Sequence, residues 1–244
     1  MIKNDLKILY NMCFKSNLNG DLKQRLDSFY KDQSSHYDSF RKRMLHGREE
    51  LIEKIIEISP ENCTTLDMGG ATAYNIQLLS DKINKFKSII IVDLCDPLLN
   101  VANSKILEFN WNNVKTINAD ASTFKSDEKV DVILFSYSLT MMPDWFLSLE
   151  RAYDNLKPGG IICVVDFNIS RKWVLKNDHI KHNFLTKIFW SSWFSIDNVF
   201  LNCDHLPWLE THFKRKFIKQ DFGKIPYLPF FKVPYYIWIG EKFI

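Results

Sequence analysis

The sequence is poor in glycine and cysteine, and it lacks any long uncharged apolar run. Eight glycines and eight prolines in 244 residues exclude a collagen-like or low-complexity chain. No stretch reaches the roughly 20 apolar residues that a membrane-spanning helix needs. Charges are spread through the opening MIKNDLKILYNMCFKSN, so we expect no secretory signal there. These absences favour a cytoplasmic protein.

The cysteines and the net charge narrow the classes further. The five cysteines are odd in number, widely spaced and without a C-x-x-C pair, which argues against a disulfide framework or a structural zinc site. We expect free thiols in a reducing compartment and no bound metal. A net charge of +3 is too small to indicate a nucleic-acid partner by itself, and none is expected.

A glycine turn after an apolar strand is the most informative local motif. In TLDMGGATAYN, which begins at Thr65, the strand ends at Asp67 and passes through Gly69 and Gly70 into a helix. Glycine lets the backbone approach a ligand closely, and a helix N-terminus offers unpaired N–H groups. The motif predicts a site for a nucleotide-like ligand. The alternative is an ordinary tight strand-to-helix turn.

A second acid supports the ligand interpretation. Asp93 ends the next apolar run, SIIIVDL, and follows Gly69 by 24 residues. In a βαβ nucleotide-binding unit, an acid about 20 residues after the glycines binds the ribose hydroxyls. A role as a strand-end or capping residue is the alternative for Asp93.

Apolar runs alternate with helical patterns through the rest of the chain. The expected strands after the glycine turn are Ser88–Leu94, Val114–Asn118, Val130–Ser136, Gly160–Phe167, Phe217–Phe222 and Pro234–Phe243. The expected helices are 5–32, interrupted near Asn19–Gly20, then one that ends at Ser59–Pro60, and finally Leu98–Phe109 and Trp145–Leu156. This order predicts a doubly wound α/β fold with a mostly parallel sheet, closed by a hairpin whose last strand is antiparallel.

Four regions follow from this pattern. We expect an N-terminal helical cover over residues 1–50, a ligand-binding core over 51–168, an aromatic and basic insertion over 169–216, and a closing hairpin over 217–244.

Several motifs together resemble those of class I S-adenosylmethionine-dependent methyltransferases. They are LDMGGATA, VDLCD, NADA, VDVILFSYSLT and LKPGG, in this order. The resemblance implies a Rossmann-like, seven-stranded fold and S-adenosyl-L-methionine as cofactor. A narrower likeness runs through YDSFRKRMLHGREEL, FSYSLTMMPDW, VVDFNISRK, FWSSWFSIDNVFLNCDHLPWL and PYLPFFKVPYYIWIG. These segments look like the N-methyltransferase of betaine-lipid synthesis, which converts diacylglyceryl-homoserine to its N,N,N-trimethyl form.

The resemblance also implies roles for individual residues. The implied cofactor-binding residues are Asp67 for the methionyl amino end, Gly69 and Gly70 beneath the cofactor, Asp93 for the ribose, Asp120 and Ala121 near the adenine, and Ser136 beside the sulfonium. Apart from the resemblance, the Arg48 guanidinium is well shaped to bind a homoserine or methionine carboxylate, and a solvated helix charge is the alternative. The sequence departs from the usual loop, which has further glycines where this chain has Ala71 and Ala73. If these alanines are left-handed, each costs on the order of 1 kcal/mol.

Methyl transfer from a sulfonium needs alignment and exclusion of water more than covalent participation by the protein. Tyr137 and Asp144 lie in the stretch SYSLTMMPDW, after the expected fourth strand, and Tyr37 precedes the core. We assign these three residues as catalytic candidates, since aromatic faces suit a methylated ammonium and a polar group could accept a proton. The alternative for each aromatic residue, Trp145 included, is a place in the core. A structural role is expected for His205.

The segment after residue 168 suggests the substrate class. Its aromatic residues are interleaved with lysines and arginines, a composition typical of surfaces that contact lipid head groups. A folded lid with buried aromatics and a single-stranded RNA-binding surface are the alternatives. Together with this composition, the resemblance implies trimethylation of diacylglyceryl-homoserine at the inner face of the membrane, with a separate protein supplying the head group. Other lipid or small-molecule methyltransferases and a non-catalytic methyltransferase-like subunit stay open.

Overall fold

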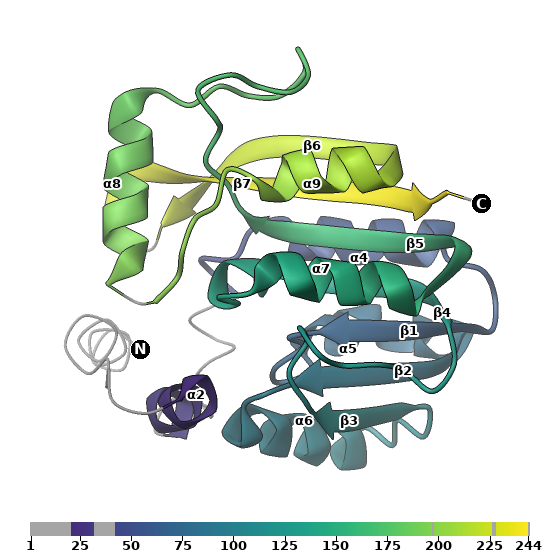
Figure 1. Cartoon of the computed structure of the whole chain (residues 1–244). Helices are drawn as coiled ribbons and strands as arrows, with labels where there is room; N and C mark the ends of the chain where they lie inside the picture. Colours follow the sequence, from purple (N-terminus) through teal and green to yellow (C-terminus); the bar gives the residue numbers. More distant parts are fainter. Residues whose placement is uncertain (1–20, 32–41, 197, 226–227, 244) are drawn as a thin grey trace.

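The protein is an α/β fold built on one seven-stranded sheet. The structure is a computed structural model that describes residues 21–31, 42–196, 198–225 and 228–243. The strands lie in the order β3-β2-β1-β4-β5-β7-β6 (Figure 1). Their bounds are β1 Cys63–Met68, β2 Phe86–Asp93, β3 Val114–Asn118, β4 Val130–Ser136, β5 Leu156–Phe167, β6 Phe213–Ile225 and β7 Leu228–Lys242. Among the described strands β7 alone runs in the opposite direction, so the predicted fold class is confirmed.

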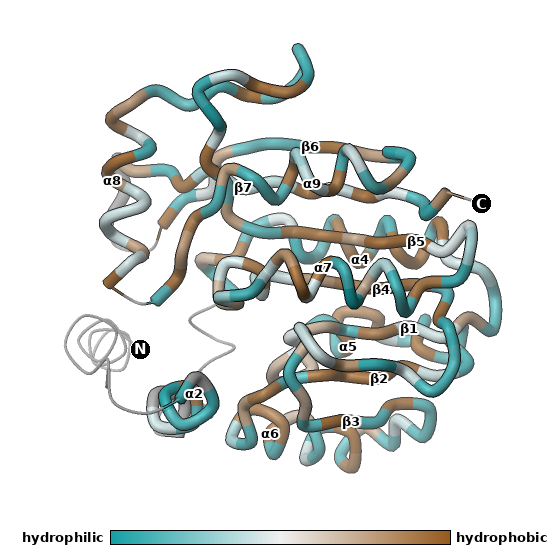
Figure 2. Tube along the Cα trace, in the orientation of Figure 1, coloured by the Kyte–Doolittle hydropathy of each residue, from teal (hydrophilic) through white to brown (hydrophobic). Residues whose placement is uncertain are grey.

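The central strands are apolar throughout because helices cover both faces of the sheet. In β4, Val132 and Leu134 enter one core while Ile133 and Phe135 enter the other. The first core is closed by α4 (Arg48–Ile58), α5 (Tyr74–Leu79), α6 (Asp96–Glu108) and α8 (Phe184–Ser195). The second is closed by α7 (Trp145–Asn155) and α9 (His205–His212). Figure 2 shows the hydrophobic colour along the central strands β4 and β5, whereas the edge strand β6 is largely hydrophilic.

Helix α4 illustrates how the sequence pattern sets an element. Leu51, Ile52 and Ile55 are buried along one face, as a 3.6-residue period requires. The helix stops at Ser59, whose backbone is extended at ψ 139°, because the residue before a proline disfavours the helical conformation. The predicted helix end at Ser59–Pro60 is therefore confirmed.

The described part of the expected N-terminal helical segment is α2 (Leu22–Lys31), and the remainder lies outside the described residues. Helix α2 contacts the start of α6. Lys23 Nζ donates to the Leu94 carbonyl at 3.1 Å and forms an ion pair with Asp96, whose N–H donates to Asp27 Oδ1 at 3.0 Å. These contacts hold α2 beside the carboxyl end of β2.

The closing hairpin is longer than predicted. Strand β6 begins at Phe213 rather than Phe217, and β7 begins at Leu228 rather than Pro234. Prolines in the second strand concealed its length in the sequence. Pro234 faces Phe222 in β6 at a point where β5 has already ended at Phe167, so its missing N–H breaks no bond to β5.

The start of β5 also differs from the prediction, because the strand begins at Leu156 rather than at Gly160. Leu156 pairs with Val130, and regular pairing resumes only when Ile161 meets Val132, so residues 157–160 form a bulge. Gly159, at φ 75°, lies in this bulge and supplies the left-handed backbone that the turn requires. Among the helices of the described ranges, none combines the length and apolarity needed to cross a bilayer.

Candidate functional site

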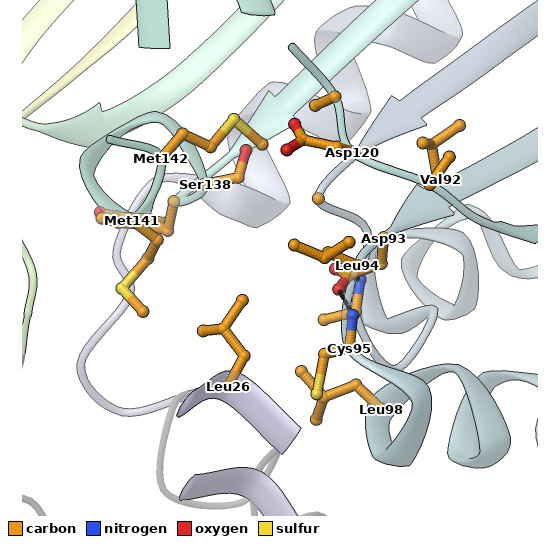
Figure 3. A pocket seen from close by; sticks show the side chains of 15 residues that line it. Leu26, Val92, Asp93, Leu94, Cys95, Leu98, Asp120, Ser138, Met141 and Met142 are labelled. Atoms are coloured by element: carbon orange, nitrogen blue, oxygen red, sulfur yellow. Dashed lines mark hydrogen bonds between the residues drawn. The ribbon is translucent and has the colours of Figure 1, made fainter. Parts of the chain in front are cut away.

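The sheet has its topological switch point between β1 and β4, where the strand order reverses. In open α/β sheets, ligands bind outside the carboxyl ends of the strands at such a point. A cleft of about 640 Å³ opens here (Figure 3). Its walls come from α2, from the loop after β1, and from the ends of β2, β3 and β4.

The loop after β1 is shaped by its two glycines. Gly69 has a φ of 76°, and its N–H donates to the Val92 carbonyl at 2.7 Å. A Cβ atom on Gly69 would lie 2.5 Å from Ser138 Cβ, and one on Gly70 would lie 2.8 Å from the Asp67 carboxyl carbon. Neither position accepts a side chain without displacing a neighbour. The glycines therefore let the loop pack closely against Ser138 and Asp67.

The two alanines of this loop adopt the left-handed backbone conformation. From the sequence alone, this conformation was only a possibility. Ala71 has a φ of 48° and Ala73 a φ of 61°, both in the left-handed region. Each costs about 1–2 kcal/mol relative to a relaxed backbone. Two hydrogen bonds hold the loop: the Ala71 N–H donates to Asp93 Oδ2 at 2.9 Å, and the Ala73 N–H donates to the Gly70 carbonyl at 3.1 Å. The loop thus forms with alanine at both places.

Asp67 lies beneath the loop and is fully buried. Asn75 Nδ2 donates to Asp67 Oδ2 at 3.0 Å, and Arg48 Nη2 donates to Asn75 Oδ1 at 3.2 Å. Burial raises the pKa of Asp67 to about 7, against the opposing effects of the Asn75 hydrogen bond and the Arg48 charge. The Arg48 guanidinium also lies 4.2 Å from the centre of the Tyr74 ring. With a pKa near neutrality, this buried acid can change its charge when a cation binds nearby.

Asp93 projects from the end of β2 into the cleft wall. Besides the Ala71 N–H, it accepts the Cys95 N–H on Oδ1 at 2.9 Å. Burial raises its pKa, while these backbone N–H groups favour the charged form and limit the rise. An ionised carboxylate has about four acceptor positions, and the N–H groups of Ala71, Cys95 and Leu94 do not fill all of them, so Asp93 can still accept a hydroxyl donor in the cleft.

Asp120 and Ala121 line the opposite wall of the cleft, after β3. Asp120 Oδ1 accepts the Ser122 N–H at 2.8 Å and the Ser122 hydroxyl at 2.7 Å. These two bonds fix the Asp120 carboxylate at the edge of the cleft, where it can accept further hydrogen bonds.

A second chamber of about 420 Å³ adjoins the cleft on the side of α4. Arg48, Gly70, Asn75 and Ser136 belong to it, and Gly69, Ala71, Tyr137 and Met141 line both chambers. The predicted residues therefore divide between two connected spaces. Gly69, Asp93, Asp120 and Ala121 line the first chamber, Arg48, Gly70 and Ser136 line the second, and Asp67 lies buried below Gly70.

Tyr137 stands at the junction of the two chambers. Its φ of 55° is unusual for an aromatic residue and marks local strain of a kind that clusters at functional sites. Its hydroxyl donates to the His46 carbonyl at 2.7 Å, and its ring packs edge-on against Phe167 at 4.7 Å. Burial raises the Tyr137 pKa well above its usual value, so the hydroxyl does not act as a base near neutral pH. Beside it, Ser136 Oγ has no hydrogen-bond partner among the described residues.

The remaining candidates lie elsewhere. Asp144 is exposed at the start of α7, because the chain turns outward before that helix, and it lines neither chamber. A catalytic role for Asp144 therefore has no support in the geometry. Trp145 packs against His205 at 4.8 Å, in the second core. Burial lowers the pKa of His205 to about 3, which keeps the ring neutral. Tyr37 lies outside the described residues.

Sequence reasoning missed Asp166, the last acid of β5. It is fully buried, and burial raises its pKa to about 7. Asp166 Oδ1 accepts the Thr140 hydroxyl at 2.7 Å, and Oδ2 accepts the Thr140 N–H at 3.2 Å. It thereby fixes η2 (Leu139–Met141), which carries Met141 into both chambers. The sequence signal that could have identified Asp166 is its position at the end of β5, because β5 ends at the same edge of the sheet as β1 and β4.

The apolar wall of the cleft was also missed. It consists of Leu26, Leu94, Cys95, Leu98, Met141 and Met142. These side chains face one another across the opening in Figure 3. A flat heterocycle with a ribose matches a space that has such a wall and carboxylates at its edges. Apolar residues carry no motif of their own, so only the fold could identify them.

Comparison with known proteins assigns the family. The profile of the ubiE/COQ5 methyltransferase family matches residues 20–189, more than half of the chain. The chain belongs to the ubiE/COQ5 methyltransferase family. A similar curated protein is the ubiquinone/menaquinone biosynthesis C-methyltransferase UbiE of Marinomonas sp. (strain MWYL1), 27% identical over 125 residues, which are 50% of this chain and 49% of that protein. The chain spans about half the length of the curated relatives it matches.

Solved structures support the fold. Haemonchus contortus phosphoethanolamine N-methyltransferase 2, in complex with S-adenosyl-L-methionine, has a TM-score of 0.69 at 14% identity, over 93% of this chain and 61% of that one. The N-methyltransferase NodS from Bradyrhizobium japonicum WM9 has a TM-score of 0.59 at 12% identity, over 81% and 94% of the two chains. The family and the fold make this a class I methyltransferase with S-adenosyl-L-methionine as cofactor.

The described residues fit this cofactor. Gly69 and Ala71 bring the loop backbone to the cleft, and the buried Asp67 beneath the loop has a pKa near neutrality, which suits an ammonium group bound nearby. Asp93 and the apolar wall suit a ribose and an adenine, and Ser136 Oγ is a buried polar atom that still lacks a partner among the described groups. When bound, S-adenosyl-L-methionine supplies an electrophilic methyl group.

The raised pKa of Asp67 predicts a pH-dependent cofactor affinity. Below about pH 7 the acid is protonated in the empty protein, so binding an ammonium group requires release of that proton. At about pH 6, one unit below the pKa of Asp67, only about a tenth of the protein has this acid ionised, whereas at about pH 8 nearly all of it does. We therefore expect the Kd for S-adenosylmethionine to be roughly tenfold higher at about pH 6 than at about pH 8. Calorimetric titration across this range measures the effect.

The matched variant for this prediction is Asp67→Asn, which cannot ionise. It should bind the cofactor weakly at every pH, with no slope. Stability gives an independent check, since a raised carboxyl pKa stabilises the empty protein below the unfolded value of about 3.8 and this stability is lost as the pH rises towards 7. A Kd that stays constant with pH in the wild type would contradict the assignment.

Proposed function

We propose that this protein methylates the amino group of a lipid head group, with diacylglyceryl-homoserine as substrate and the trimethylated betaine lipid as product. The narrow sequence likeness to the betaine-lipid N-methyltransferase suggests the substrate. The observation that carries the proposal is the position of the Tyr137 ring, which lines both the cofactor cleft and the chamber beside it. An amine that enters the second chamber meets this ring next to the cofactor cleft.

Successive methylation makes particular demands on that chamber. Each round leaves a bulkier cation with fewer N–H donors, so an aromatic face suits the substrate better than a fixed carboxylate. Ser136 Oγ can accept an N–H bond from the incoming amine. Arg48, at 7% exposure, can meet a carboxylate of the head group or of the cofactor. The Thr140 hydroxyl is buried and donates to Asp166, so Thr140 is not available to accept the proton that the amine loses. Solvent at the chamber mouth takes this proton instead.

A second candidate is C-methylation of a quinone ring. The names of the curated relatives favour it, since they include ubiquinone/menaquinone C-methyltransferases and a demethylmenaquinone methyltransferase of Listeria monocytogenes. A quinone ring carries neither an amine nor a carboxylate. The pairing of an arginine with an aromatic wall in one chamber therefore favours the amino-acid head group.

One experiment separates the candidates. Purified protein is incubated with S-adenosylmethionine and either diacylglyceryl-homoserine or a demethylmenaquinone, and methyl additions are followed by mass spectrometry. Successive additions to the homoserine lipid are expected. Methylation of the quinone alone would replace the proposal with the second candidate. Cofactor binding without transfer to either lipid would point to a non-catalytic subunit.

Variants of Tyr137 test its role. Tyr137→Ala removes a cation–π contact worth about 0.5–2 kcal/mol, so turnover of the mono- and dimethylated intermediates should fall roughly 2- to 30-fold. Tyr137→Phe keeps the ring and should retain most of the activity, because the hydroxyl is already bound to the His46 carbonyl. Turnover is measured separately for each intermediate, and cofactor affinity is measured by calorimetry.

The control for this series is Tyr153→Phe on α7, which removes a hydroxyl away from both chambers. A loss of 100-fold or more in Tyr137→Phe would instead assign the hydroxyl to proton transfer. Wild-type rates in both Tyr137 variants would exclude Tyr137 from the site and leave Tyr37 as the remaining aromatic candidate.

A further inference from the structure

Exposed large apolar side chains gather on one segment of this protein. Fourteen large apolar side chains are exposed among the described residues, and eight of these fourteen lie between residues 173 and 200. They are Trp173, Leu175, Phe184, Leu185, Ile188, Trp193, Ile196 and Phe200. Single exposed apolar residues are ordinary, but a gathered patch marks a surface that contacts something else. We call the part on α8 and on the loop before it, residues 171–196, the α8 surface.

Helix α8 is apolar on both sides. Its inner side is buried, with Phe194 packed 4.5 Å from Phe167 and Trp190 Nε1 donating to the Lys232 carbonyl at 3.0 Å. Its outer side presents Leu185 at 77% exposure and Ile188 at 50%. The helix sequence FLTKIFWSSWFS has no acidic residue and a single lysine. A helix that is apolar all round requires cover on its outer face as well.

The charge on this surface identifies what covers it. Lys172 and Lys181 lie 5.5 and 5.7 Å from the centre of the Trp173 ring, and Lys187 on α8 donates to the Arg171 carbonyl at 3.1 Å. Between residues 169 and 196 the sequence has five basic residues and one acid, Asp178, which is ion-paired with Arg215 at 2.8 Å. Aromatic residues combined with an excess of positive charge match an interface of anionic lipids.

Other occupants fit less well. A second copy of this chain would bring the same positive charges face to face, which is repulsive. Single-stranded RNA would need open ring faces for base stacking, but the Trp173 ring already has two ammonium groups beside it. An anionic bilayer accepts both the rings and the ammonium groups at once.

The α8 surface lies at the same edge of the sheet as the cleft (Figure 1). A chain of aromatic contacts joins the two. Tyr137 meets Phe167 at 4.7 Å, Phe167 meets Phe194, and Phe194 meets Trp190 at 5.7 Å. The Phe200 N–H also donates to the Thr140 carbonyl at 2.8 Å. A bilayer on this surface would therefore lie beside the mouth through which a lipid head group enters.

We infer that the α8 surface docks the protein on an anionic bilayer, with Trp173, Phe184 and Leu185 entering the head-group region and Lys172, Lys181 and Lys187 meeting lipid phosphates. The inference deepens the proposed function, because it rests on a lipid substrate. Its test measures binding rather than catalysis.

Sedimentation with vesicles tests the docking surface. The whole chain is mixed with vesicles of phosphatidylglycerol and phosphatidylcholine or of phosphatidylcholine alone, at low and high salt. Binding should be stronger to the anionic vesicles and should fall with salt, because charge attraction is screened beyond about 10 Å at 0.1 M. Leu185→Ser should weaken the partition coefficient roughly tenfold, the effect of removing one inserted leucine.

Matched controls locate the surface. Leu107→Ser on α6 changes a leucine of 78% exposure, equal to that of Leu185, and should leave vesicle binding unchanged. Lys181→Gln should weaken binding about fivefold, whereas Lys115→Gln on β3 should not. Cofactor affinity, measured by calorimetry, should be the same in all four variants, which shows that each has folded.

Three outcomes would overturn the inference: equal binding to both vesicle types, equal losses in the test and control variants, or binding of single-stranded RNA in place of vesicles. The vesicle-binding result and the methylation result can fail separately. If the protein docks but does not methylate diacylglyceryl-homoserine, the docking surface stands and the substrate assignment fails. If it methylates the dispersed lipid without docking, the reverse holds.

Discussion

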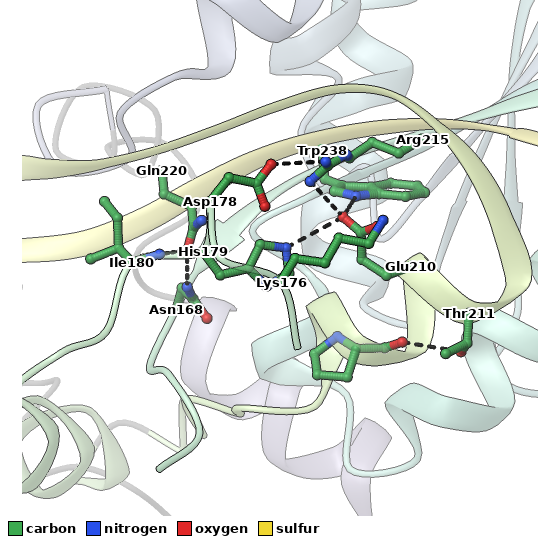
Figure 4. A network of polar contacts seen from close by, with 11 residues as sticks. Asn168, Lys176, Asp178, His179, Ile180, Glu210, Thr211, Arg215, Gln220 and Trp238 are labelled. Atoms are coloured by element: carbon green, nitrogen blue, oxygen red, sulfur yellow. Dashed lines mark hydrogen bonds and ion pairs between the residues drawn. The ribbon is translucent and has the colours of Figure 1, made fainter. Parts of the chain in front are cut away.

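Replacing Glu210 by alanine should lower the free energy of unfolding by about 3 kcal/mol. The Glu210 side chain is fully buried on α9 and gathers donors from three other segments (Figure 4). Its carboxylate accepts Lys176 Nζ, Arg215 Nη1 at 3.1 Å and Trp238 Nε1 at 3.0 Å, and His179 Nε2 lies 3.4 Å away. One acid thus joins the loop after β5 to β6 and β7.

The size of the loss follows from what the substitution leaves behind. Trp238 is fully buried, so its indole N–H would lose its partner at a cost of about 1–3 kcal/mol. Lys176 would lose its counter-ion and Arg215 would keep only its ion pair with Asp178, but both reach solvent in part, at 41% and 23% side-chain exposure. This exposure places the total at the lower end of the 3–5 kcal/mol typical of a broken buried ion pair.

The pH dependence has a definite sign. Burial raises the pKa of Glu210, but the hydrogen bonds from Lys176 and Trp238 and the nearby positive charges outweigh it, so the pKa lies below the usual 4.5. A depressed carboxyl pKa contributes stability above the unfolded value, and this contribution is lost as the pH falls through the folded value. The Glu210→Ala effect should therefore be full at neutral pH and shrink in acid.

Urea unfolding of three variants checks this. Glu210→Gln keeps an oxygen for the Trp238 N–H and should lose less than Glu210→Ala. Glu57→Ala removes an exposed partner of Lys54 and should change stability by less than about 0.5 kcal/mol. A loss below about 1 kcal/mol for Glu210→Ala would show that solvent replaces the network at little cost.

Local patterns predicted much of the sheet. The bounds of β3 and β4 match the expected Val114–Asn118 and Val130–Ser136, because each is a short segment between turns. The cofactor loop and Asp93 were found for a similar reason, since the glycines and the acid sit at fixed places relative to their strands. The roles of these residues stay predictions until binding is measured.

What the sequence did not predict depends on contacts between distant segments. Asp166 and Glu210 are conspicuous only because the fold brings Thr140 to one and Trp238 to the other. Asp144 was placed in the site by its nearness in sequence to Tyr137, but the turn before α7 carries it to the surface. Separation along the chain thus gave a poor guide to side-chain direction.

Asp93→Ala should have the largest effect on cofactor binding. The carboxylate is held by the N–H groups of Ala71 and Cys95, each at 2.9 Å, so its free acceptor positions face the cleft in a fixed direction. A ribose supplies two neighbouring hydroxyl donors that can meet it. Bonds to a charged group are worth about 1.5–3 kcal/mol, so the Kd for S-adenosylmethionine should rise roughly 10- to 150-fold.

The same substitution releases the Ala71 N–H, so loss of loop structure must be distinguished from loss of the ribose contact. Asp93→Asn keeps one oxygen for a backbone N–H but lacks the charge, and it should fall between the wild type and Asp93→Ala. Asp81→Ala, on an acid of 76% side-chain exposure in η1 (Ser80–Lys85), is the control and should bind normally. Calorimetry gives each Kd, and urea unfolding shows whether the loop has been lost. An unchanged Kd in a stably folded Asp93→Ala would mean that the ribose does not meet this carboxylate, and the cofactor would then lie elsewhere along the cleft.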